Sequence, residues 1–336
     1  MRILVTGGAG YVGSVSVEHL EGAGHDVVVL DNYASSRPGA NLAGATLVTG
    51  TYTDREAVAA LLRAERIDAV LHCGARSLVG ESIREPALYF RENVAGGIAL
   101  LEAMRDVGVE RLVISSTAAV YGVPDSTPIP EDAPLRPINP YGESKRSLEA
   151  AADWFARAYG LRAVSLRYFN VAGASATNGE RHDPETHLIP NALRAVSGGQ
   201  PLTVFGTDYP TPDGTPIRDY VDVVDLAEAH RLALEATAPG DSRTGARLLA
   251  CNLGSGVGFS VREVLTEAER VLGRQIPRSV GERRAGDPPN LVADIGRARD
   301  VLGWAPTRSS LEEMIASAWA WWSGAGKASV GERSGG

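Results

Sequence analysis

Residues 2–20 read RILVTGGAGYVGSVSVEHL, and this stretch decides the fold. A short apolar run is followed by Gly7, Gly10 and Gly13 and then by a segment of helical composition. In a strand–turn–helix unit of this kind, glycines let the backbone approach a pyrophosphate, and the helix N-terminus offers N–H donors to it. The spacing therefore predicts a dinucleotide-binding turn at the first crossover of a parallel sheet.

Strand-length apolar runs alternate with helix-period stretches throughout the first half of the chain. The runs are 2–6, 26–30, 45–49, 68–73, 111–115 and 162–169, and the helical stretches include 11–22, 54–63, 86–107 and 140–159. This alternation is typical of βαβ units. It predicts an α/β fold, a Rossmann-type doubly wound parallel sheet with a smaller, mixed C-terminal substrate domain.

Domain limits follow from a change in composition near residue 170, after which Gly, Pro, Asn, Thr and Asp become frequent. We predict a dinucleotide-binding domain over 1–170 and a second domain over 171–322. The segment 217–253 contains a strand, a helix and a second strand that we expect to return to the first sheet. The glycine-rich stretch 323–336 is predicted to be a flexible tail.

Composition limits the partners of the chain. Its 336 residues carry 33 Lys and Arg against 41 Asp and Glu, a net charge of −8 without a block of like charge, which argues against nucleic acid and anionic membranes as partners. The first residues leave no room for a signal sequence, and no apolar run reaches about 18 residues, so we expect a cytoplasmic protein. Cys73 and Cys251 show no metal-ligand spacing. We expect two buried thiols, no disulfide and no bound metal.

The type of cofactor is indicated by the end of the second predicted strand. Asp31 lies eighteen residues beyond Gly13, where an acidic side chain can accept hydrogen bonds from ribose hydroxyls and repel a 2′-phosphate. The sequence therefore favours NAD over NADP.

A candidate base lies in NPYGESK, residues 139–145, where Tyr141 and Lys145 are four residues apart on one helical face. A free phenol is only roughly 0.1% ionised at neutral pH, so a base role needs about 4 kcal/mol of stabilisation of the phenolate. A fixed ammonium and a cofactor's positive ring can supply it. The spacing alone favours a surface Tyr and Lys on a solvated helix face, so the other residues of the site have to decide. Thr117, at the end of the fifth strand, adds a hydroxyl at the same sheet edge.

Several longer strings resemble one family. TGGAGYVG, SSTAAVYG, YGESK and RYFNVAGA are similar to the extended short-chain dehydrogenase/reductase family. VGES, FGTDYPTPDGTPIRDYVDVVDLAEAH, NLGSG and RRAGD resemble its nucleotide-sugar 4-epimerase branch, and the resemblance runs from residue 1 to about 322. It implies a UDP-hexose 4-epimerase that interconverts UDP-glucose and UDP-galactose by transient oxidation at C4 with tightly bound NAD. It also implies a homodimer formed through 86–107 and 140–159.

The resemblance assigns a role to each matching position. Tyr141 becomes the acid/base at the 4-hydroxyl, Lys145 lowers its pKa and holds the nicotinamide ribose, and Thr117 contacts the same oxygen. Arg218 and Arg284 match the pyrophosphate clamps. The cofactor positions are Gly7, Gly10, Tyr11, Val12, Gly13, Asp31, Asn32, Ser35, Thr51, Tyr52, Cys73, Gly74, Ala75, Ser77, Asn93, Ser115, Tyr141, Lys145 and Tyr168. The substrate positions are Ser77, Thr117, Tyr141, Phe169, Asn170, His187, Leu188, Thr203, Val204, Phe205, Arg218, Tyr220, Arg284, Asp287 and Leu291.

The chain departs from the commonest family pattern at several positions. Thr51 stands where an acidic residue often reaches the adenine, and Cys73 replaces an aromatic residue beside the cofactor. Ser77 aligns with a Lys that reaches the sugar in some members, and Arg76 precedes it. Leu291 is intermediate between a bulky Tyr that restricts members to plain hexoses and a small residue that admits N-acetyl sugars. The preferred sugar is therefore left open.

Other activities on the same fold compete with this one. Nucleotide-sugar dehydratases and decarboxylases carry an acidic residue just after the Thr, whereas Ala118 and Ala119 follow Thr117 here. A UDP-glucuronate 4-epimerase, with Arg76 facing the C6 carboxylate, stays open, as does a UDP-N-acetylglucosamine 4-epimerase. A non-catalytic NAD-sensing regulator is a remote alternative, because it would not need Tyr141 or Lys145.

Overall fold

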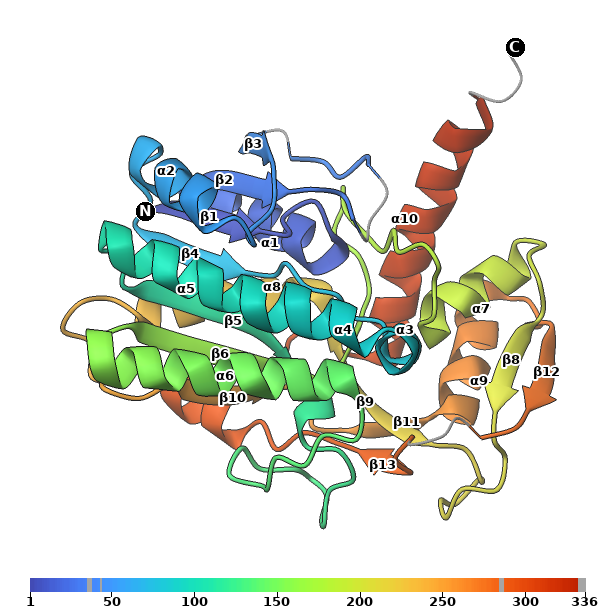
Figure 1. Cartoon of the computed structure of the whole chain (residues 1–336). Coiled ribbons are helices and arrows are strands. Elements are labelled where there is room, and N and C mark those ends of the chain that lie inside the picture. The colour runs from blue at the N-terminus through green and yellow to red at the C-terminus, as the bar shows by residue number, and fades with distance from the viewer. Residues whose placement is uncertain (35–37, 43, 284–286, 332–336) are drawn as a thin grey trace.

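A computed structural model describes residues 1–34, 38–42, 44–283 and 287–331, with side chains as far as residue 324 (Figure 1). In this part of the chain, seven strands form one parallel sheet. In sheet order they are β10 (Leu249–Leu253), β6 (Arg162–Tyr168), β5 (Arg111–Thr117), β4 (Ala69–His72), β1 (Arg2–Thr6), β2 (Asp26–Asp31) and β3 (Thr46–Thr49). The predicted doubly wound Rossmann sheet is confirmed.

Helices cover both faces of this sheet (Figure 1). Side chains of α1 (Tyr11–Gly22) and α8 (Val223–Ala236) share one apolar core with the strands. On the opposite face the core includes α2 (Arg55–Ala64), α5 (Gly96–Val107) and α6 (Pro140–Tyr159). The predicted helix 86–107 is built from α4 (Pro86–Tyr89), a π-helical stretch η1 (Phe90–Ala95) and α5, and the short helix α3 (Val79–Arg84) precedes it.

The bounds of α6 are determined by local sequence. The Asn139 side chain accepts a hydrogen bond from the Gly142 N–H at 2.8 Å and caps the helix, and Pro140 occupies the first turn, where its missing N–H costs nothing. The helix ends at Gly160, which adopts a φ of 76° that only glycine reaches without strain. Tyr141 and Lys145 are thereby fixed in the first two turns, next to the end of β5.

The second region is smaller and mixed. Its four-stranded sheet consists of β7 (Asn170–Ala172), β9 (Ile217–Asp222), β11 (Gly258–Ser260) and β13 (Asn290–Leu291), in which β11 pairs antiparallel with β9 and the other pairs are parallel. A separate pair, β8 (Leu202–Phe205) and β12 (Arg278–Gly281), lies beside it. The helices of this region are α7 (Leu188–Val196), α9 (Val261–Leu272) and α10 (Leu311–Gly331). Two short segments remain in the chain: the 3₁₀-helical η2 (Ala118–Val120) after β5 and the π-helical η3 (Ala298–Leu302) before α10.

The segment 217–253, predicted to return to the first sheet, does so in part. β10 pairs with β6 and α8 packs on the first sheet, as expected. β9 instead pairs with β7, which follows β6 after a single residue and carries the chain into the second sheet. β9 is therefore a central strand of the smaller region, and the expectation for it is corrected.

The C-terminal helix extends beyond its expected end. α10 continues to Gly331, into the stretch for which a flexible tail was predicted. No helix in the described residues combines the length and apolar character needed to cross a bilayer.

Candidate active site

A cleft of about 1580 Å³ lies where the carboxyl ends of the first sheet face the second region. Every described residue that the sequence assigned to cofactor or substrate lines this cleft, with the exception of Asn93. Ser35 and Arg284 lie outside the described residues. The fold thus brings to one cavity predicted residues that are as far apart in sequence as Gly7 and Leu291, 284 positions.

The glycines of the turn after β1 let backbone segments pack so closely that a Cβ atom would not fit between them. Gly7 adopts a φ of 68°, and a Cβ there would come within 2.6 Å of the Gly74 backbone; a Cβ on Gly13 would overlap the Gly7 carbonyl oxygen. Gly10 is the N-cap of α1, which has neither a capping side chain nor an acidic residue in its first turn. An uncapped helix N-terminus facing a cleft is suited to bind a phosphate group.

Asp31 is held rigidly at the end of β2. Its Oδ2 accepts a hydrogen bond from the Ala9 N–H at 2.9 Å, and its Oδ1 accepts one from the Tyr33 N–H at 2.8 Å. The carboxylate is thereby tied to the glycine turn on one side and to the loop after β2 on the other. This observed cradle fits a dinucleotide, with its pyrophosphate at the start of α1 and a ribose beside Asp31.

Thr117 and Tyr141 meet at the end of β5. Burial raises the pKa of the Tyr141 hydroxyl, while a hydrogen bond with the Thr117 side chain lowers it. Thr117 Oγ1 also accepts from the Ala119 N–H at 3.2 Å, which fixes the start of η2. The two hydroxyl groups therefore act as one unit at the carboxyl edge, as the sequence predicted for their positions.

Lys145 lies one turn beyond Tyr141 and is buried. Its Nζ donates a hydrogen bond to the Ser115 carbonyl oxygen at 2.7 Å. Burial lowers the pKa of Lys145 to about 8, and the neighbouring Cys73 and Glu149 oppose this decrease. At neutral pH the side chain is therefore still largely an ammonium ion, which provides a fixed positive charge behind the Thr117–Tyr141 pair.

Asn93, predicted to contact the cofactor, has a different position. It is buried behind the cleft, where its amide accepts from the Arg76 N–H at 2.8 Å and donates to the Arg76 carbonyl and to Ser144 Oγ, each at 2.9 Å. Ser144 in turn donates to the Tyr141 carbonyl oxygen at 2.8 Å. Asn93 therefore joins the loop after β4 to the first turn of α6.

The far end of the cleft carries Arg218 on β9. Its guanidinium forms an ion pair with Asp287 and donates to the Ile217 carbonyl at 2.7 Å, and its side chain is only 11% exposed. Leu291 on β13 lies opposite Arg218 in the strand register and also lines the cleft. A planar, fixed charge held in this way is suited to a diphosphate.

Sequence reasoning missed part of the lining. Glu180, His182 and Glu185 line the cleft from the loop before α7, and Trp322 lines it from α10. The signal was available in GERHDPETH, residues 179–187, which places two histidines close to several acidic residues. His187, which the sequence did assign to the substrate, is the N-cap of α7.

Comparison with known proteins agrees with this arrangement. Residues 3–245 match the model of the NAD dependent epimerase/dehydratase family. The chain is 48% identical over 324 residues to the UDP-glucose 4-epimerase of Lactobacillus helveticus, covering 96% of this chain and 97% of that protein. It superposes on the UDP-glucose 4-epimerase of Brucella ovis in complex with NAD with a TM-score of 0.90, at 43% identity, covering 95% and 97% of the two chains. The enzyme of Bifidobacterium longum in complex with NAD+ and UDP gives a TM-score of 0.90 at 33% identity, covering 96% and 98%.

Proposed function

The chain belongs to the NAD dependent epimerase/dehydratase family, and from this premise we propose that it is an NAD-dependent UDP-hexose 4-epimerase that interconverts UDP-glucose and UDP-galactose. The observation that carries the proposal is that Thr117, Tyr141 and Lys145 line one cleft together with the glycine turn and Arg218. A base, a dinucleotide cradle and a diphosphate-binding cation are the three parts that this chemistry requires.

NAD fits the residues at the first end of the cleft. The uncapped start of α1 would hold its pyrophosphate, and Asp31 would accept hydrogen bonds from a ribose. When bound, the cofactor accepts a hydride from C4 of the sugar and later returns one to the same carbon. The reaction has no net oxidation, so a tight grip on the cofactor is compatible with turnover.

Tyr141 performs the proton transfer in this proposal. Its phenolic oxygen removes the proton of the 4-hydroxyl when the sugar is oxidised and returns it when the sugar is reduced. Thr117 holds the same oxygen by hydrogen bonding, and the ammonium of Lys145 offsets the effect of burial on the phenolate. A positive charge beside the phenolate is needed because burial alone raises the pKa of Tyr141.

Inversion at C4 requires the hexose to present both faces to one hydride position. The nucleotide must stay bound while the sugar turns, so the protein has to hold the diphosphate more firmly than the hexose. Arg218, paired with Asp287 at the far end of the cleft, would supply that fixed point. We assign Arg284 the same role from the resemblance alone.

Arg76 bears on the UDP-glucuronate alternative. Its guanidinium donates to the Ala34 carbonyl oxygen at 3.3 Å and thus lies against the loop that follows Asp31. That position is at the dinucleotide end of the cleft. The contact favours a role for Arg76 near the cofactor, so a neutral hexose is the better substrate.

The direct test offers the purified protein three substrates separately: UDP-glucose, UDP-N-acetylglucosamine and UDP-glucuronate. We expect UDP-galactose from the first, at a higher kcat/KM than either of the other epimers. Absence of any 4-epimer contradicts the proposal, and preferential turnover of the glucuronate replaces it with that alternative.

A homodimer is part of the same proposal. α5 and α6 lie side by side on the surface of the first region (Figure 1). Exposed apolar side chains lie on these helices and on the adjoining η1, and they include Trp154, Tyr159, Phe90 and Ile98. Burying them against a second copy would remove apolar surface from water. Light scattering after size exclusion tests this, with a mass near twice 35.4 kDa as the expected result.

A further inference from the structure

The loop before α7 places metal-ligand side chains together inside the cleft. One ligand atom each from Glu180, His182 and His187 lies within 4.8 Å of the other two, and all three residues line the cavity. Ligand atoms held about 2.0–2.2 Å from one zinc ion are at most about 4.4 Å apart. In the tetrahedral geometry that zinc prefers, the same bond lengths place the ligand atoms about 3.4 Å apart, so side-chain shifts of about 1 Å would enclose an ion.

Glu180 and His182 are oriented by the backbone. The Glu180 carboxylate accepts a hydrogen bond through Oε1 from the His182 N–H at 3.0 Å, across a two-residue turn. The same oxygen forms an ion pair with the buried Nδ1 of His182 at 2.7 Å, in a geometry that falls short of a well-aligned hydrogen bond. The contact is close but misaligned for a hydrogen bond, and a shared cation would satisfy both atoms.

His187 is oriented by a second carboxylate. Its Nδ1 lies 2.7 Å from Glu185 Oε1, which also accepts from the Thr186 and His187 N–H groups at 2.7 Å. The Glu185 side chain is fully buried, and its Oε2 has no hydrogen-bond partner in the described part of the chain. The same Nδ1 lies 3.8 Å from Glu180 Oε2, so the two carboxylates flank one side of the imidazole, and a carboxylate held against an imidazole fixes the orientation of the ring.

From this geometry we propose a binding site for a divalent first-row transition ion of the zinc type, with Glu180, His182 and His187 as ligands and Glu185 as the group that orients His187. Two imidazoles and one carboxylate suit Zn²⁺ and disfavour Mg²⁺, which prefers oxygen ligands. The expectation of no metal rested on cysteine spacing and did not consider this loop.

The site has a consequence for catalysis, and this part rests on the proposed function. His187 is the N-cap of α7 and is predicted to contact the nucleotide sugar. A metal ion that takes His187 as a ligand removes that contact and fixes the loop in the cleft. Zn²⁺ and UDP therefore compete, and by linkage each weakens the other's affinity by the same factor.

The test titrates Zn²⁺ into the metal-stripped, full-length protein by isothermal calorimetry, without substrate and without reference to turnover. We expect one ion per chain with a micromolar Kd. Glu180→Gln and His182→Gln should each weaken binding at least tenfold. The matched control is His19→Gln, which alters a histidine on α1 that is paired with Glu228 and should bind as wild type does. Circular dichroism confirms that each variant is folded.

Three outcomes overturn the proposal: a Kd weaker than about 100 μM, unchanged binding in both ligand variants, or Mg²⁺ binding as tightly as Zn²⁺. Repeating the titration with saturating UDP tests the competition, and an unchanged Kd rejects it. Epimerase activity is measured separately in the presence of a chelator. Failure of Zn²⁺ binding with intact activity therefore refutes the metal site alone.

Discussion

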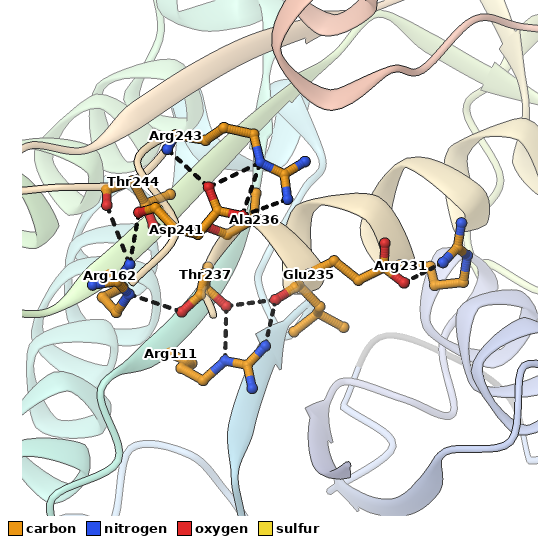
Figure 2. A network of polar contacts seen from close by, with 10 residues as sticks. Arg111, Arg162, Arg231, Glu235, Ala236, Thr237, Asp241, Arg243 and Thr244 are labelled. Atoms are coloured by element: carbon orange, nitrogen blue, oxygen red, sulfur yellow. Dashed lines mark hydrogen bonds and ion pairs between the residues drawn. The ribbon is translucent and has the colours of Figure 1, made fainter. Parts of the chain in front are cut away.

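The strands of the seven-stranded sheet begin at one side, here called the amino edge, and end at the other, the carboxyl edge. The polar side chains at these two edges differ in the partners that they bind. At the amino edge, β5 and β6 begin with Arg111 and Arg162, whose guanidinium groups donate to the end of α8 and the loop after it (Figure 2). Arg111 donates to the Leu234 carbonyl at 2.7 Å, and Arg162 donates to the carbonyls of Thr237 and Asp241 at 3.0 and 2.8 Å. These cations bind carbonyls at the end of α8 and in the loop after it, where the helical hydrogen-bond ladder stops.

At the carboxyl edge, buried polar groups have shifted pKa values or lack partners. The pKa of Lys145 is lowered to about 8 and that of Tyr141 is raised, both mainly by burial. His72, the last residue of β4, keeps a buried Nε2 without a hydrogen-bond partner among the described residues. The comparison indicates that Arg111 and Arg162 tie the amino edge to the end of α8, whereas the carboxyl edge holds its buried ionisable groups Tyr141 and Lys145 in the cleft.

The largest expected effect is at the carboxyl edge. Tyr141→Phe removes only the hydroxyl that transfers the proton, so we expect epimerase kcat to fall by about 10²- to 10⁴-fold, with NAD and UDP binding retained. The thermal midpoint should stay the same or rise, because a buried hydroxyl is lost. Steady-state kinetics and ligand-binding titration measure the two effects.

The control for this variant is Tyr159→Phe, at the exposed end of the same helix, for which we expect wild-type kinetics. Turnover of Tyr141→Phe within tenfold of wild type would remove the acid/base role from Tyr141.

The second effect is at the amino edge and should leave catalysis intact. Arg162→Met keeps the apolar stem but leaves the carbonyls of Thr237, Asp241 and Thr244 without their donor. We expect a loss of about 2 kcal/mol in the free energy of unfolding, seen as a lower urea midpoint, and an unchanged kcat. The matched control is Arg157→Met, which breaks a surface ion pair with Asp153 and should cost at most about 0.5 kcal/mol. Equal effects of the two substitutions would show that the amino-edge network contributes no special stability.

The two edges were not equally predictable from sequence. Glycines at fixed spacing, an acidic strand end at Asp31 and the Tyr141–Lys145 pair are local patterns with a known mechanism, so the sequence alone is enough to locate the carboxyl edge. Arg111 and Arg162 had no such signal, because their partners come from residues 234–244, far along the chain. A guanidinium that binds backbone carbonyls leaves no pattern in side-chain identity.

The same limit explains why the pairing of β9 and the cluster at Glu180 were not predicted. β9 was assigned to the first sheet because its sequence is compatible with either sheet, and only its pairing with β7 decides between them. Asn93 stays a prediction as a cofactor contact; its amide binds Arg76 and Ser144, a pairing that its position in the sequence does not indicate. The cluster at Glu180 was missed because a loop has no periodicity that would place its side chains on one face.

The third effect depends on pH. His72 at the carboxyl edge titrates between neutral and acidic pH, whereas the arginines of the amino edge do not. Burial lowers the pKa of His72 and of His230 to about 3, so both are neutral when folded and take up protons when unfolded below about 6.5. Their contribution to stability is therefore complete above pH 6.5. It falls by up to about 1.4 kcal/mol per pH unit for each histidine as the pH decreases toward 3. The raised pKa of Asp222, about 6, acts in the opposite direction, so variants are compared rather than absolute slopes.

Urea midpoints at pH 7.0 and 5.5 test this point. His72→Gln should lose about 1 kcal/mol less than wild type over this range, because it removes one of the two histidines. Arg162→Met should keep the full wild-type pH dependence, because guanidinium groups do not titrate there. If His72→Gln keeps the wild-type dependence, His72 is not the source of acid sensitivity.

The last expected effect concerns specificity and leaves the chemical step itself intact. Leu291 lies in β13 opposite Arg218 and lines the cleft, so its size limits the space at the nucleotide-sugar end. Leu291→Ala should raise the kcat/KM ratio of UDP-N-acetylglucosamine to UDP-glucose about tenfold, or roughly 1.4 kcal/mol, and Leu291→Tyr should lower it. Leu47→Ala, at an exposed position on β3, should leave the ratio unchanged. Opposite shifts for Ala and Tyr, with little change in the urea midpoint, are the result expected if this residue shapes the substrate pocket. Parallel losses of activity and stability in both variants would instead make Leu291 a packing residue of the second sheet.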